Sequence, residues 1–154
     1  MTRIRVHSKS LKRLKAKLKE LTRRSIGISM GARVAKLNQS IQGWVNYYKL
    51  ADMHTHCQTT DEWLRRRLRM CYWKQWKKIG ARMDNLVRLG IPGSKAWEFA
   101  NTRKGYWRIA NSPILSISLT NDYFRKLGLS GLSVVYSKSL SLRTAVCRTA
   151  RTVV

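Results

Sequence analysis

Acidic residues are scarce in this sequence. Only 7 Asp and Glu residues accompany 32 Lys and Arg residues, so the 154-residue chain carries a formal net charge of +25 at pH 7. Self-repulsion on this scale opposes a compact fold unless a polyanion neutralises it, which favours nucleic acid as the partner class and places an anionic membrane surface second. The 44% hydrophobic content is ordinary for a folded protein and excludes wholesale disorder.

Long apolar runs are missing as well. No stretch reaches the roughly eighteen apolar residues of a transmembrane helix, and the N-terminus MTRIRVHSKS lacks the apolar core of a signal peptide. We therefore expect no membrane contact and a cytoplasmic location. The three cysteines, Cys57, Cys71 and Cys147, are irregularly spaced. They do not form a disulfide framework, and a reducing compartment fits them.

Catalytic signatures are also absent. The sequence has no adjacent pair of aspartates to hold a catalytic magnesium ion, no G-x-x-x-x-G-K-[ST] loop and no G-x-S-x-G motif. His54, His56 and Cys57 lie close together, but a structural zinc site usually needs a second, separate pair of ligands, which is missing. We expect no catalysis by this chain alone, no cofactor and no metal.

Helical periodicity dominates the first third of the chain. Between residues 8 and 24, leucines form one apolar stripe at helical spacing: Leu11, Leu14, Leu18 and Leu21. Residues 29–51 repeat this spacing, so the two helices are expected to pack together. We expect Gly43 to allow close approach of the second and third helices, because a mid-helix glycine otherwise costs about 1 kcal/mol.

A third helix is expected from Thr59 to about Leu89, after a polar loop at residues 52–58. Thr59 and Glu62 match the capping-box pattern that satisfies the first amides of a helix. Projection at 100° per residue gives an apolar arc of Leu64, Leu68, Cys71, Tyr72 and Ile79. The opposite, basic arc consists of Arg66, Arg69, Trp73 and Lys77. Trp73 either stacks on a flat ligand from this solvent-facing side or packs against a neighbouring helix.

Basic side chains gather on two of these helices with few acids between them. In the first helix, Glu20 alone offsets the Lys and Arg residues, whereas an ordinary solvated face mixes both signs, so we expect contact with a polyanion. The expected phosphate contacts are Lys12, Arg13, Lys17, Arg65, Arg66, Arg69, Lys74, Lys77, Lys104 and Arg108. Trp73 and Tyr47 are the candidates for base stacking, worth about 1–3 kcal/mol per base. The core is expected to contain Trp44, Tyr48, Trp63 and Leu68.

After a break at Gly90, Pro92 and Gly93, shorter helices are expected. Two of them flank a turn at Gly105, and a further helix follows Pro113. The tail is rich in Ser, Thr and Arg and contains no acid, so it is expected to be either disordered or ordered only on RNA.

Six stretches, in the same order, resemble the C-terminal region of group II intron reverse transcriptase/maturases. They are LNQSIQGWVNYY (37–48), DEWLRRRLR (61–69), WKQWKK (73–78), LGI (89–91), AW (96–97) and KGYWRIANSPIL (104–115). The resemblance implies an all-α fold in which a helical thumb of about three helices precedes a smaller helical maturase domain, often called domain X. It places the thumb-like region and the start of domain X in residues 1–89, the remainder in 90–133 and the tail in 134–154.

The resemblance also implies a function. Proteins of this kind bind group II intron RNA and stabilise its splicing-competent fold, and the intact protein takes part in retrohoming, with target DNA as a further partner. The fingers and palm, with their Tyr-x-Asp-Asp core, are absent, so reverse transcription would require a separate fingers/palm polypeptide. The expected location becomes the bacterial cytoplasm, including the nucleoid. Two alternatives stay open: a generic basic nucleic-acid-binding protein, and the thumb subunit of a split reverse transcriptase.

Overall fold

The computed structural model describes residues 2–151, and these residues form an all-α structure, as expected. Apart from an isolated bridge between Arg5 and Asp52, helices are their only regular elements. The helices are α1 (Ser8–Leu21), α2 (Met30–Tyr48), α3 (His54–Gln75), α4 (Ile79–Arg88), α5 (Gly93–Ala100), α6 (Tyr106–Ile109), α7 (Pro113–Ser118), α8 (Asn121–Lys126) and α9 (Leu132–Arg151). None of the helices in this range is long and apolar enough to cross a membrane.

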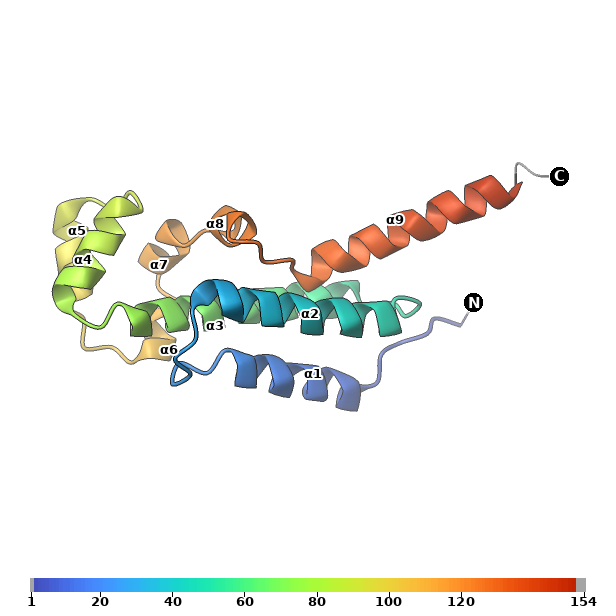
Figure 1. Cartoon of the computed structure of the whole chain (residues 1–154), viewed down its shortest axis with the longest axis horizontal. Helices are drawn as coiled ribbons and strands as arrows, with labels where there is room; N and C mark the ends of the chain where they lie inside the picture. The colour runs from blue at the N-terminus through green and yellow to red at the C-terminus, as the bar shows by residue number, and fades with distance from the viewer. Residues whose placement is uncertain (1, 152–154) are drawn as a thin grey trace.

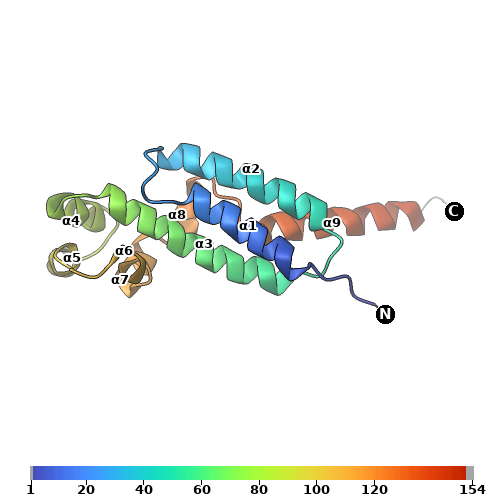
Figure 2. The same cartoon turned by 90° about the horizontal axis from the view of Figure 1, so that it is seen from below.

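The long helices pack in three layers. Helices α2 and α3 lie in the middle, α1 covers one side and α9 covers the other (Figures 1 and 2). The apolar seams seen in the sequence meet in this core, where Leu14, Leu18, Leu37, Ile41, Leu64 and Leu68 are all buried. Leu132 and Val135 of α9, which belong to no predicted seam, are buried with them. Trp44, Tyr48 and Trp63 pack against it while partly exposed, and Leu68 is fully buried, as predicted.

The short helices extend the bundle at the C-terminal end of α3. Helices α4 and α5 pack against each other there, and α6 to α8 return along α3 (Figure 1). Gly90 ends α4 with a positive φ of 96°, and the amides of Gly90 and Ile91 bond back to Val87 and Leu86. This Schellman arrangement requires a left-handed residue, which explains the glycine. The predicted single helix after Pro113 is in fact two, α7 and α8.

The predicted start of the third helix is wrong. Helix α3 begins at His54, so most of the expected polar loop is helical, and the Thr59 hydroxyl donates back to the carbonyls of Thr55 and His56. The carboxylate of Asp61 is buried and accepts bonds from the amides of Leu132 and Ser133, at 2.7 and 2.9 Å. It therefore caps α9, a helix that begins 71 residues later in the chain.

The predicted end of the third helix is also wrong. Helix α3 stops at Gln75, and the backbone turns at Trp76, whose ring is buried and whose carbonyl accepts from Arg82 Nε at 2.9 Å. The chain then starts α4 at Ile79. That residue is 50% exposed and does not belong to the apolar arc of α3, because it lies on a different helix.

Two further expectations fail. A Cβ added at Gly43 would meet no atom within 4 Å, so this exposed glycine does not serve a close helix approach. The tail was expected to be either disordered or ordered only on RNA; residues 134–151 belong to α9, so the expectation of disorder is wrong there, and residues 152–154 lie outside the described range. Helix α9 forms because Leu132, Val135 and Tyr136 bury their side chains against α2 and α3.

Candidate nucleic-acid interface

Cations greatly outnumber ion pairs on this protein. Residues 2–151 contain two pairs, Arg3–Asp52 and Arg125–Asp122, both exposed to solvent. Exposed pairs of this kind contribute little to stability. Among the other cations, some contact carbonyl groups or aromatic rings of the protein, and others extend into solvent.

One group of cations stabilises the C-terminal end of α1. Arg33 is 2% exposed and donates from Nη1 to the carbonyls of Leu21 and Arg23 and from Nη2 to that of Ile26. Arg67 reaches the same helix end, donating to Thr22 Oγ1 and to the carbonyls of Lys19 and Thr22. Cations are favoured there because the last carbonyls of a helix are unsatisfied and carry partial negative charge.

Neither of these two arginines was among the predicted functional residues. Burial lowers the pKa of Arg67, and the neighbouring charge of Arg33 lowers it further, although Cys71 acts in the opposite direction. A signal for Arg33 was present in the sequence, since it precedes Leu37 and Ile41 by four and eight residues and so lies on the apolar seam of α2. An arginine in such a seam indicates a buried bonding partner.

Two predicted phosphate ligands, Arg66 and Arg69, have partners within the protein. Arg66 donates from Nε and Nη2 to the carbonyl of Trp107, and its guanidinium carbon lies 3.8 Å from the centre of the Trp107 ring. Arg69 donates to the carbonyl of Leu119, and burial lowers its pKa. These bonds attach α6 and the end of α7 to α3, so both side chains contribute to folding.

The prediction that Trp73 is available for base stacking is wrong. The indole is 2% exposed, packs against Trp76 at 6.1 Å between ring centres and lies under the guanidinium of Arg82. The helix projection missed this because the chain turns back after α3 and covers the face that a lone helix would expose. The exposed rings are instead Tyr47 at 80%, which was predicted, and Trp97 and Trp107 at 61% and 38%, which were not.

Two adjoining hollows form a basic surface between the α1–α2 loop, α3 and α6. The first is lined by Arg23, Arg24, Ser25, Arg67, Met70 and Trp107. The second is lined by residues 24–29 together with Arg33, Cys71, Lys74, Gln75 and Lys77. We call the two hollows together the basic groove. Six cations and no acid line it, and it contains the predicted ligands Lys74 and Lys77.

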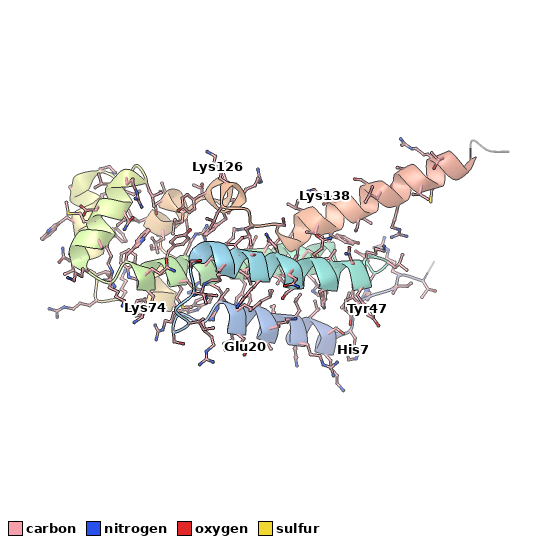
Figure 3. The ribbon with its side chains drawn as sticks, viewed as in Figure 1. His7, Glu20, Tyr47, Lys74, Lys126 and Lys138 are labelled. Carbon is pink, nitrogen blue, oxygen red and sulfur yellow. The ribbon has the colours of Figure 1, made fainter. Side chains whose placement is uncertain are left out.

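Tyr106 of α6 lies beside this groove, next to Trp107, which lines it. Arg24 lies 4.5 Å from the centre of the Tyr106 ring, and Lys74 Nζ lies 5.4 Å from the same point. Figure 3 shows Lys74 near the end of α3, on the side of α6. Cation–π contacts of this kind hold flexible cationic side chains in place while their charge remains available.

The other predicted ligands lie outside the groove. Lys12, Arg13 and Lys17 are exposed along α1, ahead of the groove. Arg65 lines a third hollow on α3 together with Arg66, Arg69 and Glu62, and Trp107 lies between this hollow and the groove. Lys104 and Arg108 are exposed at either side of the start of α6. The structure therefore distributes the predicted ligands over several surfaces and brings Lys74 and Lys77 together with cations that the sequence did not single out.

Residues 11–90 of the chain match the family described as group II intron, maturase-specific domain, and this segment is more than half of the sequence. The chain belongs to this maturase-specific domain family. No curated protein matches it. The matched segment contains most of α1, all of α2 to α4, and every cation that lines the basic groove. Helix α6 lies outside the matched residues 11–90, and its Trp107 lines the basic groove together with the matched cations.

No metal centre accompanies the maturase-specific domain in residues 2–151, where no three His, Cys, Asp or Glu side chains gather closely enough to hold an ion. Cys57 and Cys71 are buried, and Cys71 Sγ lies 3.2 Å from the carbonyl of Thr22, to which it donates. Burial raises the pKa of both thiols. These two cysteines therefore belong to the core.

Proposed function

We propose that this maturase-specific domain binds group II intron RNA and stabilises its splicing-competent fold, while the RNA carries the splicing chemistry. The family membership names the RNA, and the basic groove supplies the observation that supports binding. Six cations with no acid among them form a surface that a phosphate backbone neutralises. Lys12, Arg13 and Lys17 on α1 extend the contact along the same helix that leads into the groove.

Exposed rings add the second component of RNA recognition. Trp107 lines the groove at 38% exposure, and RNA-binding surfaces commonly combine cations with rings on which unpaired bases stack. We assign to Trp107 the stacking role that the sequence suggested for Trp73. Tyr47, on the distant end of α2 (Figure 3), is a second proposed contact.

The decisive experiment is a binding titration of the chain with its cognate intron RNA and with an unrelated structured RNA of equal length. Both are measured at about 200 mM salt, because a protein that makes about 6–10 phosphate contacts loses about 10³–10⁵-fold in affinity between 50 and 200 mM. A clear preference for the intron supports the maturase function. Equal affinity for both RNAs contradicts it and identifies a generic basic nucleic-acid-binding protein.

Variants for this titration follow from the partners of each cation. Lys12→Ala, Lys17→Ala and Lys77→Ala remove exposed charges that have no intramolecular partner in residues 2–151, so they are expected to weaken binding without changing the melting temperature. Arg66→Ala is unsuitable as a binding variant, since it also removes the bonds to Trp107. Its melting temperature is expected to fall.

A further inference from the structure

The buried charge of Arg33 has no anionic partner in the part of the chain that the structure describes. All three of its hydrogen bonds end on neutral carbonyls, and its Nε, which is shielded from solvent, has no acceptor. A buried charge is strongly unfavourable unless an opposite charge or several strong hydrogen bonds compensate it. The buried charge of Arg33 is therefore only partly compensated by the protein itself.

Arg33 also lines the second hollow of the basic groove, here called the Arg33 hollow. Three more cations surround the hollow: Arg24, Lys74 and Lys77. The wall opposite α3 is the α1–α2 loop, which Arg33 itself holds through the carbonyls of Arg23 and Ile26. Ser29, the N-cap of the 19-residue helix α2, lines it too, so the positive end of that helix dipole adds to the field.

We propose that the Arg33 hollow binds one phosphate group, and that this phosphate supplies the counter-charge that Arg33 lacks. The inference rests on the proposed function in one respect: it takes the phosphate to be part of the RNA backbone. Four cations and no acid line this hollow, which suits a compact anion better than a base or an apolar group. Lys74, in the last turn of α3, and Lys77, two residues after that helix ends, contact the phosphate directly.

Binding at this position has a consequence for the fold. Arg33 joins the end of α1 to the α1–α2 loop, so a phosphate that offsets its charge stabilises the same segment of the protein. A ligand that binds only the folded state stabilises it by RT ln(1 + [L]/Kd), so the melting temperature rises as the ligand concentration increases. Inorganic phosphate alone should therefore stabilise the chain.

The first test is thermal melting of the full chain in sodium phosphate and in sodium chloride at equal ionic strength. We expect a higher melting temperature in phosphate. The double variant Lys74→Gln/Lys77→Gln should lose this difference, whereas Lys126→Gln/Lys138→Gln, which removes equal charge from α8 and α9, should keep it (Figure 3). Equal melting of the unmodified chain in both salts overturns the proposal.

The second test separates RNA from free phosphate as the source. Affinity for a single-stranded RNA oligonucleotide is measured against salt concentration for both double variants. Loss of one phosphate contact should reduce the slope of log K against log salt by roughly 0.7 for the groove variant and leave the control slope unchanged. If phosphate stabilises the protein but the two variants bind RNA alike, the hollow holds a free ion and the RNA assignment is overturned.

The two proposals fail in different ways. Absence of a preference for intron RNA contradicts the maturase function and leaves the phosphate-specific stabilisation measurable. Lys77→Gln alone provides a second variant if the double variant melts early, because the exposed Lys77 side chain has no partner in residues 2–151. An unchanged salt slope in that variant, together with an intact preference for the intron, overturns the Arg33 hollow and leaves the maturase function standing.

Discussion

At the scale of single residues, arginine side chains have two kinds of partner in this protein, backbone carbonyls and aromatic rings. Arg33, Arg66, Arg67 and Arg69 donate to backbone carbonyls from distant parts of the chain. The guanidinium group suits this role because its five N–H donors reach several carbonyls at once, whereas a lysine ammonium lacks that fixed fork. The lysines at the surface are consequently the better candidates for phosphate contacts.

Arg33 provides the sharpest test of this structural role. Arg33→Met keeps much of the side-chain volume and removes bonds to three carbonyls, so we expect a loss of about 1.5–3 kcal/mol or more in the free energy of unfolding. Arg33→Lys should recover only part of the free energy of unfolding that Arg33→Met loses. Urea unfolding measures both, with the exposed Lys36→Met on the same helix as the control. An Arg33→Met variant as stable as the control would contradict the role assigned to these bonds.

The three cysteines should differ in reactivity. Burial raises the pKa of Cys57 from near 9 to about 12, with the charge of Asp61 adding to the effect, and burial also raises the pKa of Cys71. Both folded thiols are therefore protonated at pH 8. Because the folded pKa lies above the unfolded one, the stability that Cys57 contributes is complete below pH 9 and declines as pH rises toward 12.

We accordingly expect a thiol reagent at pH 8 to modify Cys147 quickly, since it is exposed, and the two buried thiols only as the protein unfolds. The release of chromophore from a disulfide reagent measures this, with and without denaturant. Cys147→Ser should remove the fast phase. Fast modification of more than one thiol in the folded chain would contradict the burial of Cys57 and Cys71.

At the scale of elements, α9 depends on an acid that lies in another helix. The carboxylate of Asp61, on α3, accepts hydrogen bonds from the first amides of α9. Gly131 lies so close that an added Cβ would be 2.9 Å from this carboxylate. The negative charge also suits the positive end of the helix dipole. Helix α9 is thus joined to the bundle at its N-terminus, while residues 140–149 are largely exposed along its outer length.

Asp61→Ala should therefore destabilise α9 in particular. Loss of an N-cap costs about 1–2 kcal/mol, and we expect a decrease in helical circular dichroism together with a lower urea midpoint. Asp61→Asn, which keeps one acceptor oxygen, should have a urea midpoint between those of Asp61→Ala and the unmodified chain. Asp84→Ala on α4 removes an exposed acid and is the control. Equal stability of Asp61→Ala and Asp84→Ala would show that the cap is unimportant.

At the scale of the whole molecule, the net charge of +25 opposes folding and favours binding. Like charges repel across the surface, and salt screens them over about 8–10 Å at physiological concentrations. Salt must therefore act in opposite directions on the two processes. It strengthens the fold of the free protein and weakens its attachment to RNA.

We expect the melting temperature of the free chain to rise between about 20 and 300 mM sodium chloride, by about 2–4 °C for each kcal/mol of repulsion that is screened. A Lys9→Glu/Lys15→Glu variant, which lowers the net charge on the exposed face of α1, should show a smaller rise. Differential scanning fluorimetry measures both. A melting temperature that stays constant or falls with salt would contradict the self-repulsion.

Local patterns in the sequence correctly predicted the all-α fold, the first two helices and much of the core. Leu14 and Leu18 of the α1 seam and the Leu64 and Leu68 positions of α3 are buried as expected, and Leu11 and Leu21 are partly buried, because helical periodicity follows from the pattern of neighbouring residues. The same reasoning failed at Thr59 and Trp73. A capping-box pattern does not show whether an earlier helix start is available, and a helix projection does not show which face a later segment covers.

Helical content, a large excess of positive charge and the family relationship therefore follow from the amino-acid sequence. The availability of each cation for a ligand follows from the three-dimensional fold, since Arg33 and Arg67 bind carbonyls 7 to 48 residues away while Lys77 faces solvent. The fold also assembles the basic groove, because its cations come from the α1–α2 loop, α2, α3 and the link between α3 and α4. A hydrogen bond between distant segments depends on how the helices pack, and local sequence patterns carry no record of that packing.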